Sequence, residues 1–304
     1  MQVAVSGASG FVGSALAGAL ADAGHEVTAL TRRPDQYRGV GDPVGFDISD
    51  PSTLQAALEG QDVVYYLVHS LAKVDFSGED RLGAEAFASA ATDAGLTQVI
   101  YLGGLGDSAD DLSEHLRSRR EVESILLAGA PTTALRAGLV IGDGGISWEI
   151  LRQLVERLPV MITPRWVQTR TQPISLGDAL AALVGVLGRD EAVGETYEIG
   201  GPDVLTYRSM METAARVMGR HRLIVPVPFL SPRLSSHWLR LITDVDLQTA
   251  RALIDSMTNE VVVHNHRIAD LVGPASTSFA AAVEEALAAR AARLERETGP
   301  RAAG

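Results

Sequence analysis

Short apolar runs alternate along the first half of the chain with longer segments rich in alanine and leucine. These runs, together with short segments that mix apolar and β-branched residues, predict β-strands at 3–5, 26–31, 44–46, 62–68, 98–102 and 132–137. The segments between them predict helices at 14–23, 52–58, 77–94 and 111–127. The run over 62–68 is apolar almost throughout, as expected of a central parallel strand buried on both faces. Because parallel strands need helical crossovers, the pattern predicts an α/β fold with a doubly wound parallel sheet, the Rossmann architecture.

The second half of the chain has a less regular pattern. It predicts helices at 147–157, 176–187, 207–218 and 276–297, strands at 195–199 and 260–263, and an extended edge segment at 223–228. Leu234, Trp238, Leu241 and Ile242 recur at helical spacing, which predicts core or a substrate lid, with a membrane-surface helix as the alternative. Since no repeat or flexible linker is visible, we expect a sheet domain over 1–145 and a smaller, interleaved substrate lobe over 146–304.

A glycine-rich turn, Gly-Ala-Ser-Gly-Phe-Val-Gly over 7–13, connects the first predicted strand to the first predicted helix. Gly7 allows a sharp turn, Gly10 lets a pyrophosphate approach the backbone, and Gly13 lets the helix pack closely against the strand. Backbone N–H groups and the helix dipole favour an anion there. The turn predicts a dinucleotide site, and a purely structural turn is the alternative. The residues expected to hold the cofactor here are Gly7, Ser9, Gly10, Phe11, Val12 and Gly13.

The end of the second predicted strand indicates which dinucleotide is preferred. In dinucleotide-binding folds this strand end meets the adenosine ribose, and an acidic residue there selects NAD. Here Thr31 is neutral and is followed by Arg32 and Arg33, which suit a 2′-phosphate. The alternative is that the two arginines form only a solvated basic turn with no ligand. We therefore expect NADP(H) to be preferred, with NAD(H) as the alternative.

Two further pairs of residues follow strand ends where a cofactor would lie. Asp47 and Ile48 come after the third strand, where an adenine ring would cross the sheet edge, although plain loop residues fit equally well. Val68 and His69 end the fourth strand on the side where ligands bind in such sheets. His69 is expected either to contact the cofactor or substrate or to be a satisfied structural histidine.

Composition excludes several function classes. The formal net charge of −12 opposes non-specific binding to nucleic acid. The chain has no cysteine, which excludes disulfides, thiolate metal sites and cysteine nucleophiles, and no metal site is predicted. No apolar run reaches the length of a membrane span. Met1 leads directly into the first strand, leaving no room for a signal peptide, so a cytoplasmic location is expected.

The chain resembles the atypical or extended short-chain dehydrogenase/reductases, in the NmrA-like or complex I 39-kDa-subunit-like branch. The resemblance rests on the glycine turn and on six further segments that follow in the expected order over nearly the whole chain. They are Arg-Arg-Pro at 32–34, Asp-Ile-Ser-Asp-Pro at 47–51, Tyr-Leu-Val-His-Ser at 66–70, Tyr-Leu-Gly-Gly-Leu at 101–105, Leu-Arg-Ala-Gly-Leu-Val-Ile-Gly at 135–142 and Gln-Pro-Ile at 172–174. The resemblance implies an NAD(P)-binding Rossmann fold.

The usual catalytic residues of that superfamily are replaced in this chain. The superfamily works with a Ser or Thr after strand five and a Tyr-x-x-x-Lys pair on the next helix. Here the strand-five position corresponds to Gly103 or Gly104, the tyrosine to His115 and the lysine to Arg119. A neutral histidine can accept a proton, and an arginine can hold ribose hydroxyls. His115 and Arg119 are four residues apart, so they share one helix face; a solvated face without chemistry is the alternative.

The leading functional hypothesis is an NADP(H)-dependent oxidoreductase that acts on a small organic substrate, such as a carbonyl compound or an alcohol. The first alternative is a cofactor-binding sensor or an accessory subunit of an electron-transfer complex. A sugar-nucleotide epimerase or dehydratase is a weaker alternative, because those enzymes keep the Tyr-x-x-x-Lys pair that this chain lacks. The sequence predicts no nucleic-acid partner and no particular oligomeric state.

Overall fold

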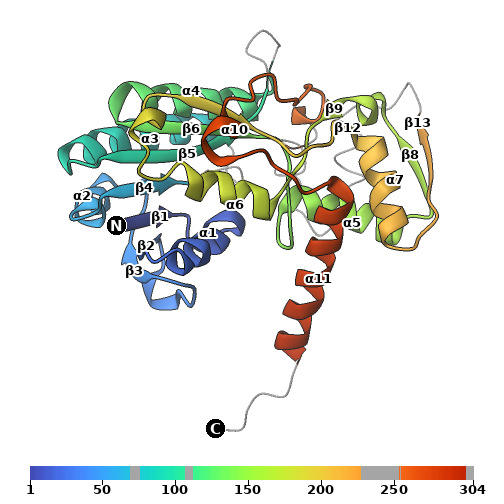
Figure 1. Ribbon diagram of the computed structural model, residues 1–304, viewed down its shortest axis with the longest axis horizontal. Helices are drawn as coiled ribbons and strands as arrows, with labels where there is room; N and C mark the ends of the chain where they lie inside the picture. Colours follow the sequence, from blue (N-terminus) through green and yellow to red (C-terminus); the bar gives the residue numbers. More distant parts are fainter. Residues whose placement is uncertain (69–75, 107–111, 227–252, 254, 299–304) are drawn as a thin grey trace.

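The computed structural model describes residues 1–68, 76–106, 112–226, 253 and 255–298. Its centre is a seven-stranded, fully parallel sheet with the strand order β11-β6-β5-β4-β1-β2-β3 (Figure 1). The strands are β1 (Gln2–Ser6), β2 (Glu26–Thr31), β3 (Asp42–Gly45), β4 (Val63–Tyr66), β5 (Gln98–Gly104), β6 (Thr132–Ala137) and β11 (Thr196–Ile199). The order reverses between β1 and β4, which confirms the predicted doubly wound architecture.

Helices cover both faces of the sheet (Figure 1). One layer contains α1 (Phe11–Asp22), α6 (Leu176–Gly185) and α10 (Ile268–Val272); the other contains α2 (Leu54–Leu58), α3 (Phe76–Asp93) and α4 (Glu114–Gly129). Alternate strand residues enter the two cores: Val3 and Val5 pack with α1 and α6, whereas Ala4 packs with α2 and α3. Both faces of the central strands are buried, which explains their nearly continuous apolar sequence.

The second half of the chain builds a smaller core around the fully buried Trp148. The helices around it are α5 (Ile146–Arg157), α7 (Tyr207–Val217) and α11 (Phe279–Thr298). The short strand pairs beside it are β7–β10 (Val140–Ile141, Ile174–Ser175), β8–β13 (Val160–Thr163, Leu223–Pro226) and β9–β12 (Arg170–Thr171, Leu205–Thr206). The 3₁₀ helix η3 (Arg165–Gln168) contributes Val167 to this core, and the described chain also contains the 3₁₀ helices η1 (Pro34–Gln36), η2 (Pro51–Thr53) and η4 (Asp190–Ala192). Because α6 and β11 return to the large sheet, the two halves are interleaved; the boundary at residue 145 stays a prediction.

Several elements differ from the sequence prediction at their ends. Helix α1 starts at Phe11 rather than at residue 14, since Gly10 is already its N-cap. Helix α4 starts at Glu114 rather than at residue 111, because the Ser113 hydroxyl accepts the N–H of Leu116 at 3.3 Å and caps the helix. Residues 227–228 of the predicted edge segment, and the stripe at 234–242, lie outside the described residues.

The prediction of a strand at 260–263 is wrong. Val261 forms only an isolated parallel bridge with Thr171. Its N–H donates to the carbonyl of Arg170 and its carbonyl accepts the N–H of Gln172. The next backbone bond of the ladder is missing. The N–H of Val263 donates instead to the side-chain oxygen of Gln172, with 3.0 Å between the nitrogen and the oxygen. A buried side-chain amide thus ends the pairing after one residue.

Candidate active site

The glycine turn has the sharp bend expected at Gly7 and the close packing expected at Gly13. Gly7 has a φ of +70°, a conformation that residues with a Cβ rarely adopt. The N–H of Gly10 donates to the carbonyl of Gly7 at 2.8 Å and closes the turn. A Cβ on Gly13 would overlap the Gly7 carbonyl oxygen and lie 2.8 Å from its carbonyl carbon. The start of α1 therefore packs so closely against the turn after β1 that position 13 has no room for a side chain.

The N-terminus of α1 is open for an anion. Its N-cap, Gly10, carries no side chain that could bond the first-turn N–H groups, and the first turn contains no acidic residue. Those N–H groups have no partner within the helix, because the intrahelical bonds begin later. Ser9 is exposed beside them. The turn therefore fits a pyrophosphate. The N–H groups of the first turn of α1 would donate hydrogen bonds to it, and the helix dipole would stabilise its negative charge.

A cavity of about 470 Å³ extends from this turn over the carboxyl ends of the central strands. Leu67 after β4, Leu102 in β5 and Gly138 after β6 line its floor. Val68 is partly buried next to Leu67 but does not line the cavity, and His69 lies outside the described residues. The cavity thus occupies the position where doubly wound folds bind ligands.

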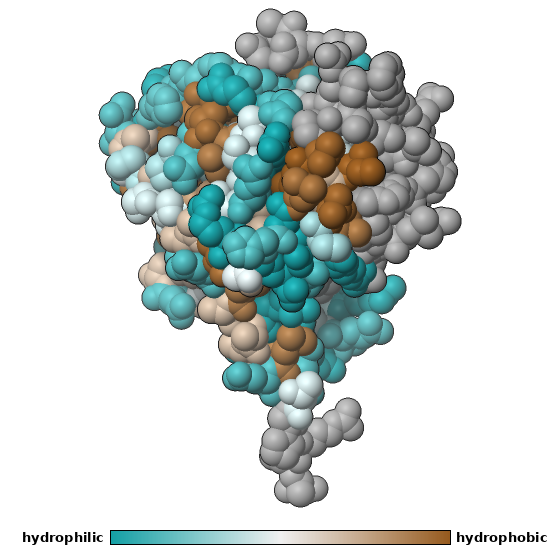
Figure 2. All heavy atoms as spheres, turned by 90° about the vertical axis from the view of Figure 1, so that its right-hand side faces the viewer, coloured by the Kyte–Doolittle hydropathy of each residue, from teal (hydrophilic) through white to brown (hydrophobic). Residues whose placement is uncertain are grey.

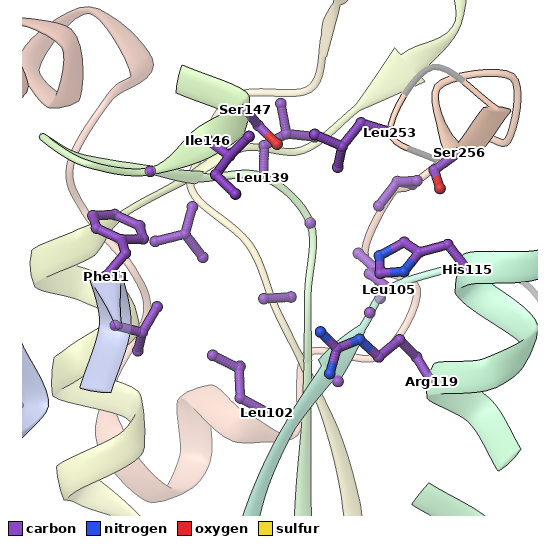
Figure 3. Close-up of a pocket in the computed structure, with 18 of the residues that line it drawn as sticks. Phe11, Leu102, Leu105, His115, Arg119, Leu139, Ile146, Ser147, Leu253 and Ser256 are labelled. Carbon is purple, nitrogen blue, oxygen red and sulfur yellow. The ribbon is translucent and has the colours of Figure 1, made fainter. Parts of the chain in front are cut away.

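Figure 3 shows that the walls of the cavity come from both halves of the chain. Phe11 and Ile146 stand on one side, and His115 and Arg119 stand on the other. Residues of the second half close it, namely Ser147, Tyr207, Leu253, Ser256, Met257 and Val261. Sequence reasoning did not identify these residues, because no local pattern marks them and only the tertiary fold brings them to the sheet edge.

The Phe11 ring is enclosed by a glycine-rich loop that sequence reasoning also missed. A Cβ on Gly142 would lie 3.0 Å from the ring, and a Cβ on Gly145 would lie 2.9 Å from it. Only residues without side chains let this loop pass so close to the start of α1. The signal was present in the sequence as the glycine cluster at 142–145, which leads directly into α5.

His115 and Arg119 lie on the same face of α4, as their spacing predicted, and both side chains point into the cavity (Figure 3). Burial first, and the nearby Arg119 guanidinium second, lower the pKa of the His115 imidazole to about 3. The ring is therefore neutral at any ordinary pH. Within the described part of the chain, no carboxylate forms an ion pair with Arg119. This site combines a neutral imidazole with an uncompensated cation in largely apolar surroundings.

Contacts from both halves of the chain hold the turn of α4 that carries His115. The N–H of Ser113 donates to the Asn259 side-chain oxygen at 3.0 Å, and the Ser113 hydroxyl lies 3.0 Å from that of Ser256. One turn further on, the buried Tyr101 hydroxyl donates to the backbone carbonyl of Arg119 at 3.0 Å. These contacts hold the stretch of α4 backbone that carries His115 and Arg119.

A buried ion pair anchors the same helix to the sheet. Arg136 in β6 donates to both carboxylate oxygens of Glu123 in α4, at 2.5 and 2.9 Å. The Thr196 hydroxyl of β11 lies 3.4 Å from the same carboxylate. Because Glu123 is almost fully buried, loss of Arg136 would leave an unpaired charge in the core.

The two glycines at the end of β5 leave no room for the usual hydroxyl of the superfamily. A Cβ on Gly104 would lie 2.8 Å from the Leu116 side chain, and a Cβ on Gly103 would lie 2.7 Å from the Tyr101 ring. Leu116 and Tyr101 occupy the space that a serine or threonine would need. The site therefore differs from the superfamily pattern in its packing as well as in its sequence.

The two arginines after β2 are exposed at the edge of the sheet next to the glycine turn. The N–H of Arg33 donates to the Thr31 hydroxyl at 3.3 Å, which fixes the backbone where β2 ends. In the chain as described, no acidic side chain pairs with either guanidinium. Both cations remain available to an anionic ligand.

Asp47 and Ile48 lie after β3 and outside the cavity. The Asp47 carboxylate accepts the N–H of Ser49 at 2.9 Å, so it stabilises its own loop. A Cβ on Gly83 would lie 2.7 Å from the Ile48 side chain, so this side chain packs directly against α3. A contact of either residue with an adenine ring remains a prediction.

Comparison with known proteins places these features in a family. Residues 7–154 match a family model described as NAD(P)H-binding. The chain is 30% identical to a (4-alkanoyl-5-oxo-2,5-dihydrofuran-3-yl)methyl phosphate reductase of Streptomyces griseus over 72% of this chain and 74% of that protein. It is 30% identical to a ceramide reductase of Caulobacter vibrioides, over 84% of this chain and 79% of that protein. It is also 28% identical to subunit 9 of the NADH dehydrogenase 1 alpha subcomplex of Arabidopsis thaliana, although it spans only 60% of that subunit.

Solved structures share the fold. The Citrobacter triphenylmethane reductase complexed with NADP(H) superposes with a TM-score of 0.75 at 19% identity, over 94% of this chain and all of that one. A short-chain dehydrogenase/reductase superfamily protein of Agrobacterium tumefaciens with bound NAD superposes with a TM-score of 0.70 at 17% identity, over 98% of this chain and 99% of that one. None of the helices in the described part of the chain has the length and hydrophobicity that a membrane span requires. On the NAD(P)H-binding family model and the two reductase relatives at 30% identity, the chain belongs to the atypical short-chain dehydrogenase/reductases, with an NAD(P)-binding Rossmann fold.

Proposed function

We propose that this protein is an NADP(H)-dependent oxidoreductase that acts on a small, largely apolar carbonyl compound or the corresponding alcohol. One observation carries the proposal: a single cavity joins the pyrophosphate-binding turn to an imidazole and a guanidinium that point into it. The two reductase relatives support the same reaction class. A screen of apolar carbonyl compounds for oxidation of NADPH tests the proposal.

The roles of the polar side chains follow from their positions. The nicotinamide cofactor, when bound, supplies or accepts the hydride. Arg119, nearer the strand ends, would hold ribose hydroxyls and place a permanent positive charge beside the reacting oxygen. His115 lies next to the second-half residue Ser256 and would hydrogen-bond the substrate oxygen (Figure 3). A neutral imidazole polarises a carbonyl by donating an N–H, as in other enzymes whose histidine pKa is low.

Arg119, and not His115, carries the positive charge in this site. A histidine with a pKa of about 3 carries no positive charge at neutral pH, so His115 cannot donate a proton as an imidazolium. In carbonyl reduction the hydride forms the new C–H bond, the C=O π-electrons move to oxygen, and that oxygen then takes a proton from water. Arg119 stabilises the negative charge that develops on oxygen before the proton arrives.

The rate of turnover is expected to be independent of histidine protonation. The folded-state pKa of His115 lies near 3, below the unfolded value of about 6.5, so the ring stays neutral as the pH falls through 6.5. A profile of kcat/KM between pH 5 and 9 should therefore show no inflection from this residue, and its imidazole NMR signals should not titrate there. An inflection near pH 6–7 that disappears in His115→Ala would contradict the assigned environment.

Preference for NADP(H) over NAD(H) rests on the two exposed arginines after β2. Replacing both, in Arg32→Ala with Arg33→Ala, removes two charge-assisted hydrogen bonds to a 2′-phosphate, which NADH lacks. We expect the dissociation constant of NADPH to rise by at least about tenfold, and that of NADH by less than about threefold. Titration calorimetry with both cofactors measures the difference.

Arg38→Ala provides the matched control for this experiment. Arg38 lies in the same loop, but its guanidinium donates to the backbone carbonyls of Asp35 and Tyr37 at 2.8 and 2.6 Å. It should leave the NADPH-to-NADH ratio unchanged. Equal losses for both cofactors in the double variant, or a wild-type preference for NADH, would overturn the assignment.

A non-catalytic role is the second hypothesis, because one relative is a subunit of mitochondrial NADH dehydrogenase. That role needs a bound cofactor but no open substrate space. The cavity favours the enzyme, since it continues beyond the glycine turn to the second half of the chain. Tight NADPH binding without turnover would decide for the accessory role.

A further inference from the structure

The strand pair β8–β13 carries an apolar face toward solvent. Its parallel register places Val160 beside Leu223 and Ile162 beside Val225. These four side chains are 39–59% exposed, whereas Met161 and Ile224, which point the other way, are almost fully buried. Figure 2 shows apolar side chains gathered on the face of the molecule where this strand pair lies. Four adjacent exposed aliphatic side chains form a patch of the kind that marks an interaction site.

Positive charge borders this patch at one edge. Because β8 and β13 are parallel and in register, the residues that precede them lie at the same end. Arg220 and His221 stand just before Leu223, and both are exposed. The border of the patch at this end therefore carries the positive charge of Arg220.

The sequence around β13 is unusual for this acidic protein. Between Glu212 and Asp244 it contains no acidic residue, but five arginines and two histidines, in a chain whose net charge is −12. Exposed aliphatic side chains next to arginines are the combination that holds proteins at bilayers with anionic headgroups. A second copy of the chain fits less well, since four side chains supply only a small part of the roughly 800 Å² per partner that a stable dimer buries.

We propose that the β8–β13 face docks the protein on a lipid bilayer that contains anionic headgroups. The four aliphatic side chains enter the boundary between headgroups and acyl chains, and Arg220 contacts the headgroup phosphates. This surface is separate from the cavity, whose lining contains none of these residues. Docking there would bring the proposed enzyme to substrates dissolved in the bilayer.

Flotation of the full-length protein with vesicles tests the proposal. The wild-type chain should float with phosphatidylcholine vesicles that contain about a quarter phosphatidylglycerol, and bind pure phosphatidylcholine vesicles less. The double variant Ile162→Ser with Leu223→Ser should lower the partition coefficient by at least about tenfold. Arg220→Glu should weaken binding to the anionic vesicles only. Because these side chains are exposed, the melting temperature and NADPH affinity of each variant should match those of the wild type.

Leu82→Ser is the matched control, because Leu82 is 58% exposed on α3, far from the patch in the fold. It should float like the wild type. The proposal is overturned if the wild type does not float with anionic vesicles, or if the double serine variant floats equally well. It is also overturned if light scattering shows a wild-type dimer that the double variant converts to a monomer, because the face would then bind a second copy.

Discussion

The variant Gly13→Ala is expected to lose measurable binding of both NADPH and NADH. The added methyl group would overlap the carbonyl oxygen of Gly7, a backbone atom that cannot move without shifting the turn. Overpacking of this kind costs about 1–3 kcal/mol of stability. A displacement of about 1 Å in a binding turn weakens function by about a hundredfold. Calorimetric titration and thermal unfolding measure the two effects.

Gly18→Ala is the matched control in the same helix. A Cβ on Gly18 meets no atom within 4 Å, and the residue lies in the interior of α1. Alanine there should stabilise the helix by up to about 1 kcal/mol and leave cofactor affinity unchanged. If Gly13→Ala bound both cofactors as tightly as Gly18→Ala does, the glycine turn would not be the cofactor site.

The variant Arg119→Met is expected to lower turnover by about 10²–10³-fold, because it removes the charge that stabilises the developing oxyanion. Methionine keeps the apolar part of the side chain, so the wall of the cavity that Arg119 lines is largely retained. NADPH affinity should fall as well, since the guanidinium also holds the ribose in this account. Steady-state kinetics and calorimetry on the same samples separate the two effects.

His115→Ala distinguishes the roles of the two residues. It should lower kcat by a similar factor, about 10²–10³, with little change in NADPH affinity, because the imidazole contacts only substrate in this account. Arg117→Ala is the control, since Arg117 is exposed on the other side of α4 and does not line the cavity. If His115→Ala left turnover unchanged, the substrate oxygen would be bound by another group.

The sheet and the cofactor turn were predictable because their signals are local. The strands expected at 26–31 and 132–137 match β2 and β6 residue for residue, since both segments combine apolar with β-branched residues, which strands favour. The glycine spacing at 7–13 is dictated by backbone contacts within the same turn. The pairing of His115 with Arg119 also follows from helix periodicity alone.

The remainder of the site depends on contacts between distant parts of the chain. Ser113 is fixed by Asn259, 146 residues later, and the low pKa of His115 arises chiefly from its burial in a cavity that residues of the second half help to close. The failed strand at 260–263 has the same origin, because the Gln172 side chain takes the bond that a strand partner would make. No window of sequence around these residues contains that information.

Transfer of deuterium from NADPH labelled at the nicotinamide C4 position tests whether this protein reduces carbonyl compounds. Wild-type protein is incubated with labelled NADPH and a panel of apolar aldehydes and ketones, and the products are analysed by mass spectrometry. We expect deuterium on the former carbonyl carbon of at least one product, and a loss of about 10²–10³-fold in its rate of formation in Arg119→Met. Tight NADPH binding with no labelled product from any acceptor would contradict this expectation and identify the chain as a cofactor-binding subunit.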